Sequence, residues 1–201
     1  MTDFRVLEYD KIDSTNEEAK RLVREAARRP FDTVITAKHQ TAGKGRRGKR
    51  FFSPGGDSIY ASFILKPPKE PAEQLITAFA AVAVCEAIEQ ATDYRPRIKW
   101  LNDIYVGGKK VCGILAEGIS GAAILGIGVN INIIEENFSD ELRDIAGSLH
   151  MSREKRDRLF GDLIGRVFCY AAAEAGSSEA EALTKEYCRR EGSDRLTRGV
   201  S

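Results

Sequence analysis

The sequence is organised around residues 38–57, KHQTAGKGRRGKRFFSPGGD, which lie between two strand-like stretches. This segment contains five glycines, carries five cations between Lys44 and Arg50, and has Asp57 as its only acid. A glycine-rich backbone lets N–H groups approach a bound group closely, and the cations favour an anion. Long loops in small domains are typically functional or disordered. The segment therefore predicts a binding loop for an anionic ligand, with phosphate as the first candidate.

Three other interpretations of this loop are weaker. Residues 43–48, GKGRRG, fit G-x-G-x-x-G, but that dinucleotide motif leads into a helix, whereas the following residues KRFFSPGG have no helical periodicity. A P-loop fails because Gly45 follows Lys44 where Ser or Thr is required, and Lys38 stands at its first glycine. A nucleic-acid patch is the third alternative, and the formal net charge of only +1 argues against it.

The composition indicates one domain with a sizeable core. The chain has 201 residues, 42% of them hydrophobic, and its 30 acids nearly balance 31 bases, so no bulk charge favours DNA or a membrane. The four cysteines are far apart in the sequence and predict neither a disulfide framework nor a zinc site. Cys85 and Cys169 fall on apolar helical stripes, where we expect buried thiols. The first residues, MTDFRVLEYD, resemble neither a signal peptide nor a membrane span, so we expect a cytoplasmic, reduced protein.

Hydrophobic periodicity predicts a mixture of short strands and longer helices. Strands are expected over residues 4–12, 33–37, 58–65, 98–100, 104–106, 111–116 and 122–132, with a hairpin turn at Gly107-Gly108. Helices are expected from about residue 15 to Pro30, after Pro71, after Ser152 and over residues 180–190. The helix after Pro71 is expected to be strongly amphipathic.

The first helix begins in DSTN, residues 13–16, which has two interpretations. Thr15-x-x-Glu18 and Ser14-x-x-Glu17 both fit a capping box, so capping is the simpler one. A hydroxyl at a helix start can also face a ligand.

Residues 98–117, IKWLNDIYVGGKKVCGILAE, place polar side chains inside apolar strand sequence. Lys99, Asn102, Asp103 and Lys110 suit either a solvated edge strand or a polar site at one end of a sheet.

Residues 122–132, AAILGIGVNIN, form an apolar strand in which Gly126 and Gly128 leave one face bare. Such a face admits either a ligand or the packing of a helix. Asn130 and Asn132 are expected to alternate onto one face beside that bare surface.

Together, these separated motifs resemble the biotin protein ligase family over roughly residues 8–190. The matching motifs are DSTN (13–16), QTAGKGRRG (40–48), FSP (52–54), KWLND (99–103), KVCGIL (110–115) and GIGVN (126–130). The resemblance implies an α+β fold shared with class II aminoacyl-tRNA synthetases: a mixed, largely antiparallel sheet with helices mainly on one face. It implies a catalytic domain over residues 1–190 and a tail, 191–201, where an SH3-like C-terminal domain begins in most members.

The resemblance also implies an ATP-dependent biotin protein ligase. Biotin and MgATP would give biotinyl-5′-AMP, and a lysine of a biotin carboxyl carrier protein or domain of a biotin-dependent carboxylase would then take the biotin. Mg²⁺ would come with ATP, and no metal site of the protein itself is expected. Many members are homodimers, and this arrangement is open here. We expect no DNA binding, because the first strand starts where some members have a winged helix, and no membrane partner.

Site residues carry over from the matching motifs. The biotin site would comprise Ser14, Thr15, Gln40, Gly43, Lys44, Arg46, Lys110, Gly113, Gly126 and Gly128. The ATP site would comprise Lys44, Arg46, Arg47, Phe51, Phe52, Asn102, Asp103, Lys110 and Asn130. Arg46 and Lys110 would be catalytic, because they would stabilise the charge that develops as the anhydride forms. Phe51 stands where many members have tryptophan, and Leu101 stands where many have proline. Lys44 stands where many have arginine, and lysine cannot bind a phosphate or carboxylate with two parallel hydrogen bonds as arginine does.

Two other functions stay open. One is a lipoyl or octanoyl ligase or transferase from the same superfamily, which the GRRG loop and the KWLND segment fit less well. The other is a non-catalytic biotin- or nucleic-acid-binding module, against which the presence of Arg46 and Lys110 argues.

Overall fold

The structure is a computed structural model that describes residues 4–28, 30–67, 73–99, 102–173 and 177–191. Trp100 and Leu101 of the KWLND motif and the predicted tail from residue 192 onward lie outside the described residues.

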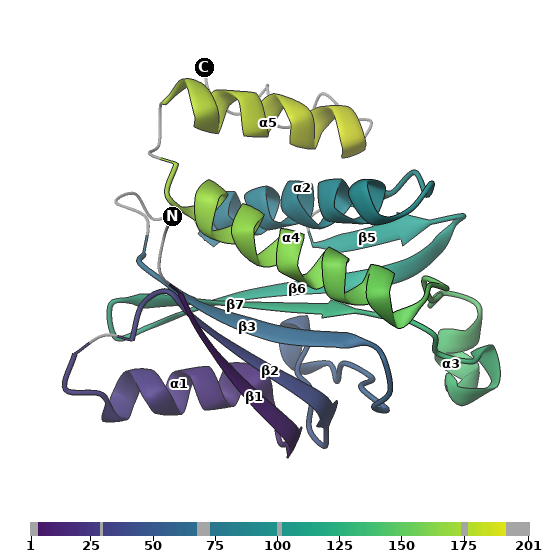
Figure 1. Ribbon diagram of the computed structural model, residues 1–201, viewed down its shortest axis with the longest axis horizontal. Helices are drawn as coiled ribbons and strands as arrows, with labels where there is room; N and C mark the ends of the chain where they lie inside the picture. The colour runs from purple at the N-terminus through teal and green to yellow at the C-terminus, as the bar shows by residue number, and fades with distance from the viewer. Residues whose placement is uncertain (1–3, 29, 68–72, 100–101, 174–176, 192–201) are drawn as a thin grey trace.

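A seven-stranded sheet forms the centre of the fold (Figure 1). Its strands are β1 (Arg5–Ile12), β2 (Thr33–Gln40), β3 (Ile59–Leu65), β4 (Arg97–Lys99), β5 (Asp103–Val106), β6 (Lys109–Ile119) and β7 (Ala122–Val129). They lie in the order β1-β2-β3-β7-β6-β5-β4, and only the β1–β2 pair is parallel. Gly107 and Gly108, both with positive φ, make the β5–β6 hairpin turn as predicted.

The helices cover the two faces of the sheet unequally. They are α1 (Thr15–Glu25), α2 (Glu73–Ala91), the single turn α3 (Asp140–Arg143), α4 (Arg153–Ala171) and α5 (Ser178–Glu191). Helices α2 and α4 lie on one face, and α5 packs outside α2 (Figure 1). Of the helices in the described ranges, only α1 packs on the opposite face, against β2, β3 and β7. The predicted fold class, a largely antiparallel sheet with helices mainly on one face, is confirmed. Within the described ranges, no helix combines the length and apolar character that crossing a bilayer requires.

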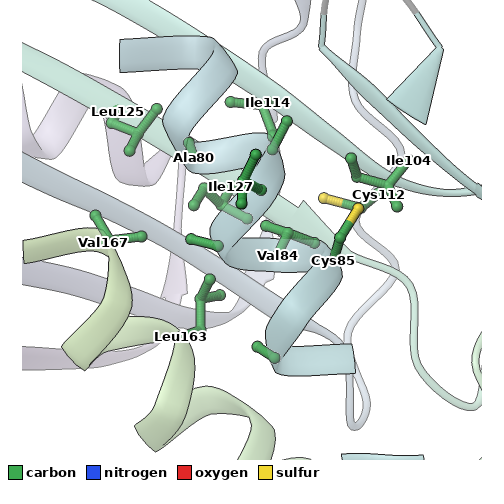
Figure 2. Packing of buried hydrophobic residues seen from close by; sticks show 14 of the residues in the cluster. Ala80, Val84, Cys85, Ile104, Cys112, Ile114, Leu125, Ile127, Leu163 and Val167 are labelled. Atoms are coloured by element: carbon green, nitrogen blue, oxygen red, sulfur yellow. The ribbon is translucent and has the colours of Figure 1, made fainter. Parts of the chain in front are cut away.

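Helix α2 is the centre of the main core. Figure 2 shows Ala80 and Val84 of α2 beside Ile127 of the sheet, and Leu163 of α4 faces the same cluster. The expectation that α2 is strongly amphipathic is wrong: Val82 and Val84 are both fully buried. The sheet, α4 and α5 together cover α2 on nearly all sides, so it needs no polar face.

Of the two cysteines that were predicted to be buried, one is buried and the other is exposed. Cys85 is buried in the core, and burial raises the pKa of its thiol to about 12, so it acts as a small apolar side chain. Cys169 is exposed, and the expectation of burial is wrong there. It follows Phe168, one position beyond the buried stripe of α4, so it points to solvent.

Strand alternation separates the core from the second face of the sheet. Leu125, Ile127 and Val129 of β7 point into the core under α2. Ile124 packs under α1, and Gly126 and Gly128 share its face because side chains alternate along a strand. The α1 face is therefore bare at the end of β7 that lies beyond Ile124.

Candidate active site

A cavity of about 60 Å³ opens on the α1 face of the sheet, over this bare part of β7. Its lining includes eleven of the predicted site residues: Ser14, Thr15, Gln40, Lys44, Arg46, Phe51, Asn102, Lys110, Gly113, Gly126 and Gly128. It also includes residues that the sequence analysis did not select: Asn16, Gly45, Ala61, Ile114, Leu115 and Ile127. Segments that are far apart in the sequence thus meet at one site.

The floor at one end of the cavity consists of Gly113 and Gly128, which are cross-strand partners on β6 and β7. The ring of Phe51 lies directly on both. A Cβ added at Gly128 would lie 2.5 Å from this ring, and one at Gly113 would lie 2.9 Å from it. Phe51 also meets Tyr60 edge-on, with ring centroids 6.3 Å apart. The bare face is needed here for an aromatic side chain of the binding loop itself.

Gly126 has a different neighbour. A Cβ at this position would lie 2.2 Å from Asn16 Oδ1, which enters from the first turn of α1. At Gly126 the helix-packing alternative therefore holds, because the missing side chain makes room for α1.

Ser14 and Thr15 face the cavity without capping α1. Ser14 is the N-cap residue, but its hydroxyl makes no capping hydrogen bond. Glu17 and Glu18 of the expected boxes bind other side chains, Glu17 with Lys20 and Lys44 and Glu18 with Tyr9 and Arg21. The capping-box interpretation is wrong, and both buried hydroxyls lie at the cavity wall.

Gln40 fixes the position of Thr15 and of the loop end. Its Oε1 accepts a hydrogen bond from the backbone N–H of Thr15 at 2.8 Å, and its Nε2 donates to Ser53 Oγ at 3.0 Å. Ser53 Oγ in turn donates to the carbonyl of Phe51 at 3.2 Å. Gly43 completes this junction, because a Cβ there would lie 2.6 Å from the same carbonyl. Gly43 thus shapes the loop and does not line the cavity.

The basic part of the loop is held at two points. Lys44 Nζ pairs with Glu17 Oε1 of α1 at 2.7 Å, and hydrogen bonds from Lys44 and Lys20 lower the pKa of Glu17 below its usual value. Arg46 Nη1 donates to Asn102 Oδ1 at 2.9 Å. The loop therefore spans the site from α1 to the segment before β5.

Lys110 and Arg46 are linked by one line of polar contacts that runs through Asn102 and Asp103. Lys110 Nζ lies 2.7 Å from Asp103 Oδ1, and Asn102 Nδ2 donates to the same oxygen at 3.0 Å. The backbone of Lys110 is also fixed, because its N–H donates to the carbonyl of Ile145 and its carbonyl accepts from the N–H of Gly147. Asp103 thus orients Lys110 from outside the cavity. The two predicted catalytic cations lie at opposite ends of this line of polar contacts.

Besides Asp103, three predicted ATP-site residues lie outside the cavity lining. Arg47 is exposed and adopts a positive φ of 54°. Phe52 packs on Phe138, with ring centroids 5.7 Å apart. Asn130 is buried and donates through Nδ2 to the carbonyl of Gly147, while its Oδ1 is buried without a partner among the described residues.

Asn132 does not share a face with Asn130 beside the glycines. It has a positive φ of 54° and donates to Asp57 Oδ2 and to the carbonyl of Met151. The expected alternation is wrong because β7 ends at Val129 and the chain turns there.

The sequence analysis missed a polar group behind the cavity. Asn16 Nδ2 donates to Glu117 Oε2 at 2.8 Å, and Ser62 Oγ lies 2.5 Å from Asn16 Oδ1. Lys20 Nζ contacts Glu117 Oε1 at 2.7 Å. Ser62 could have been noticed, because it is a polar residue inside the apolar strand IYASFIL. The described residues contain no cluster of three or more His, Cys, Asp or Glu side chains suited to a metal ion.

Sequence comparison relates this chain to known proteins. Residues 9–133 match the model of the biotin/lipoate A/B protein ligase family. The chain is 43% identical over 157 residues to the bifunctional ligase/repressor BirA of Bacillus spizizenii, covering 74% of this chain and 47% of that protein. It is 29% identical over 183 residues to the biotin–[acetyl-CoA-carboxylase] ligase of Mycobacterium tuberculosis, covering 85% of this chain and 68% of that enzyme.

A solved structure shows the same fold. The biotin protein ligase of Aquifex aeolicus in complex with biotin and ATP superposes with a TM-score of 0.71 and 28% identity, covering 83% of this chain and 70% of that one. The chain spans about half the length of the Bacillus relative, 47%. Because the family model covers more than half of the chain, the protein belongs to the biotin/lipoate A/B protein ligase family.

Proposed function

We propose that this protein is a biotin protein ligase. In the first step a biotin carboxylate oxygen attacks the α-phosphorus of MgATP, the bond from that phosphorus to the bridging oxygen breaks, and pyrophosphate leaves. In the second step a carrier lysine attacks the carbonyl carbon of biotinyl-5′-AMP, and AMP leaves. The observation that carries this proposal is the line of polar contacts through Asn102 and Asp103, whose two end cations, Arg46 and Lys110, both line the glycine-floored cavity.

The charges suit this chemistry. A carboxylate attacking ATP brings two anions together, so the reaction needs cations that converge on the reacting atoms. Lys110 would act at the biotin carboxylate and the α-phosphate, and Arg46 from the loop would act on the same atoms. Lys44, which Glu17 holds at the opposite wall, would support the phosphates.

The experiment that tests the proposal is biotin-dependent release of pyrophosphate from MgATP by the 201-residue chain. Release that needs biotin would establish adenylation, and transfer to an added biotin carrier domain would establish the second step. A folded chain that binds biotin but releases no pyrophosphate would instead support a binding-only role.

The hydrogen-bonding groups of the cavity favour biotin over lipoate. Ser14, Thr15 and Gln40 crowd one wall. The ureido ring of biotin offers N–H donors and a carbonyl to such groups, whereas the dithiolane ring of lipoate offers neither. A polar site rejects a ligand that leaves its buried groups unpaired.

We therefore expect biotin, at about 100 times its Kd, to raise the melting temperature by roughly 5–10 °C. Lipoate at the same concentration should leave it unchanged. A thermal-shift titration with the two acids measures this difference, and an equal shift with both would favour the lipoyl-ligase alternative.

The loop must move for the ligand to enter. The cavity of about 60 Å³ holds a few water molecules but not a bicyclic acid, and Phe51 covers its glycine floor. Biotin would displace this ring, and the loop would then close over the adenylate and exclude water.

We expect trypsin to cleave the ligand-free protein within residues 43–52 and to cleave it about tenfold more slowly when biotinyl-5′-AMP is bound. Mass spectrometry of the fragments locates the cuts. Equal cleavage rates at these positions, with and without the adenylate, would contradict loop closure.

The partners follow from the same proposal. The acceptor would be the carrier protein or domain of a biotin-dependent carboxylase. The exposed edge strand β1 leaves room for a homodimer, and the near-zero net charge does not favour DNA. Cys85 and Cys112 are free buried thiols in the core, as suits a reducing compartment such as the cytoplasm.

A further inference from the structure

A line of polar contacts runs behind the cavity from a charged pair to the Thr15 hydroxyl. It starts at Lys20 Nζ, 2.7 Å from Glu117 Oε1, and continues from Glu117 Oε2 to Asn16 Nδ2 at 2.8 Å. Asn16 Oδ1 lies 2.5 Å from Ser62 Oγ, which lies 2.8 Å from Thr15 Oγ1. Residues from α1, β3 and β6 thus make one connected line that ends at the cavity wall.

The direction of each hydrogen bond is fixed from the charged end. An ionised carboxylate can only accept, so Asn16 must turn its Nδ2 toward Glu117 and its Oδ1 toward Ser62. The amide oxygen can also only accept, so the single proton of Ser62 goes to Asn16. Ser62 Oγ can then only accept from Thr15.

Thr15 has no proton left for a ligand. Its hydroxyl proton goes to Ser62 Oγ at 2.8 Å in preference to Gln40 Oε1, which lies 3.1 Å away and already accepts from the Thr15 N–H. Only lone pairs of Thr15 Oγ1 are then left for a ligand in the cavity. Ser14 differs, because its hydroxyl makes no capping bond and can donate or accept.

Burial preserves the directions of these hydrogen bonds. Ser62 is fully buried, and Asn16 is 4% exposed, so water cannot supply alternative partners. The Lys20 side chain is 13% exposed. Burial would lower the pKa of Lys20, but its hydrogen bonds to Glu117 and Glu17 raise it above the usual value, so the ammonium group stays charged.

We propose that Glu117 is a positioning residue that sets the head-group selectivity of the site. Anchored by Lys20, it orients Asn16 and, through Ser62, commits the Thr15 hydroxyl to accepting a hydrogen bond. The selected head group must therefore carry an N–H donor, as a cyclic urea does. The inference rests on the proposed function, because that function supplies biotin as the ligand.

The test is a double-mutant cycle read out by the Kd of biotin in the absence of ATP. Glu117→Gln keeps the side-chain shape but can donate as well as accept, so Asn16 can flip and the order is lost. We expect it to weaken biotin binding about tenfold, the effect of losing one well-oriented hydrogen bond. Desthiobiotin has the same ureido ring without the sulfur ring, so its affinity should fall by the same factor. The KM of MgATP should not change.

The second arm of the cycle is Thr15→Val, which removes the hydroxyl and keeps the shape. If Glu117 acts through Thr15, Glu117→Gln should have no further effect in the Thr15→Val background. Equal losses in both backgrounds, or an unchanged Kd in Glu117→Gln, would overturn the inference. Failure of the wild-type chain to bind biotin at all would instead count against the proposed function.

Two further variants keep the outcome interpretable. Glu8→Gln alters an exposed acid on β1 outside the cavity lining and should leave the Kd of biotin unchanged. Lys20→Met removes the anchor of Glu117 and should weaken biotin binding in the same direction. It serves as the test if Glu117→Gln does not melt cooperatively. An unchanged Kd in a folded Lys20→Met variant would also count against the inference.

Discussion

Replacing Lys110 by alanine should reduce biotin-dependent pyrophosphate release by about 100- to 1,000-fold. Lys110 lines the cavity, its backbone N–H and carbonyl are both hydrogen-bonded to residues 145–147, and Asp103 holds its ammonium group at 2.7 Å. Such a preorganised cation needs no rearrangement when negative charge develops on the attacking carboxylate and the phosphate. Its removal therefore acts on the transition state, and the loss should appear in kcat. A steady-state pyrophosphate assay at saturating biotin and MgATP measures it.

Lys109→Ala is the matched control. Lys109 is the neighbouring cation on the same hairpin, but its Nζ donates to the carbonyl of Arg143 at 2.8 Å, away from the cavity. This variant should keep the rate within about twofold of wild type, as is usual for surface substitutions. If both lysine variants lose activity equally, damage to the hairpin rather than loss of the Lys110 charge would explain the result.

The second large effect is expected for Arg46→Gly, which should release the adenylate early. Arg46 reaches the site from the loop, where its Nη1 donates to Asn102 Oδ1. Its positive charge would hold the anionic adenylate in the site once the anhydride has formed. Loss of a hydrogen bond to a charged group should speed adenylate dissociation by about 10- to 100-fold. Free biotinyl-5′-AMP would then acylate lysines of bystander proteins. Streptavidin blotting of added albumin measures this labelling.

Lys49→Gly controls for loop flexibility, because it places glycine in the same loop at an exposed cation outside the cavity lining. Bystander labelling by this variant should stay at the wild-type level. Labelling that does not rise in Arg46→Gly, or that rises equally in Lys49→Gly, would show that Arg46 is not the retaining residue.

The sequence predicted the elements because their signals are local. Apolar runs identified β3 and β7, and the Gly107-Gly108 pair identified the β5–β6 hairpin. Helix α4 begins after Ser152 as predicted, and the Ser152 side chain accepts from the N–H of Lys155. Each of these features depends on residues a few positions apart. The environment of α2 could not be predicted in this way, because α4 and α5, which follow it in the chain, bury its outer side.

The candidate site was predictable only in part. The motifs identified most of the cavity lining, including Lys110 and Gly128, because each motif keeps its residue types and spacing. They did not separate residues at the cavity from their neighbours: Phe52 turns to Phe138, and Asn130 to Gly147. In a segment without regular secondary structure, two neighbouring side chains can point in opposite directions. The residue types alone do not say which of the two faces the cavity.

The sequence by itself determined the family, the kinds of secondary structure and the residue types that the chemistry requires. The tertiary structure alone decided what those residues touch. It placed Phe51 on two glycines of β6 and β7, and it placed Ser14 and Thr15 at the cavity wall instead of in capping hydrogen bonds. It also brought Asn16 into a hydrogen bond with Glu117, which lies 101 positions away in the sequence. The physical reason is that strand register and helix docking are long-range properties. Packing of the whole core fixes them, and a buried polar group binds whichever partner that packing brings within reach.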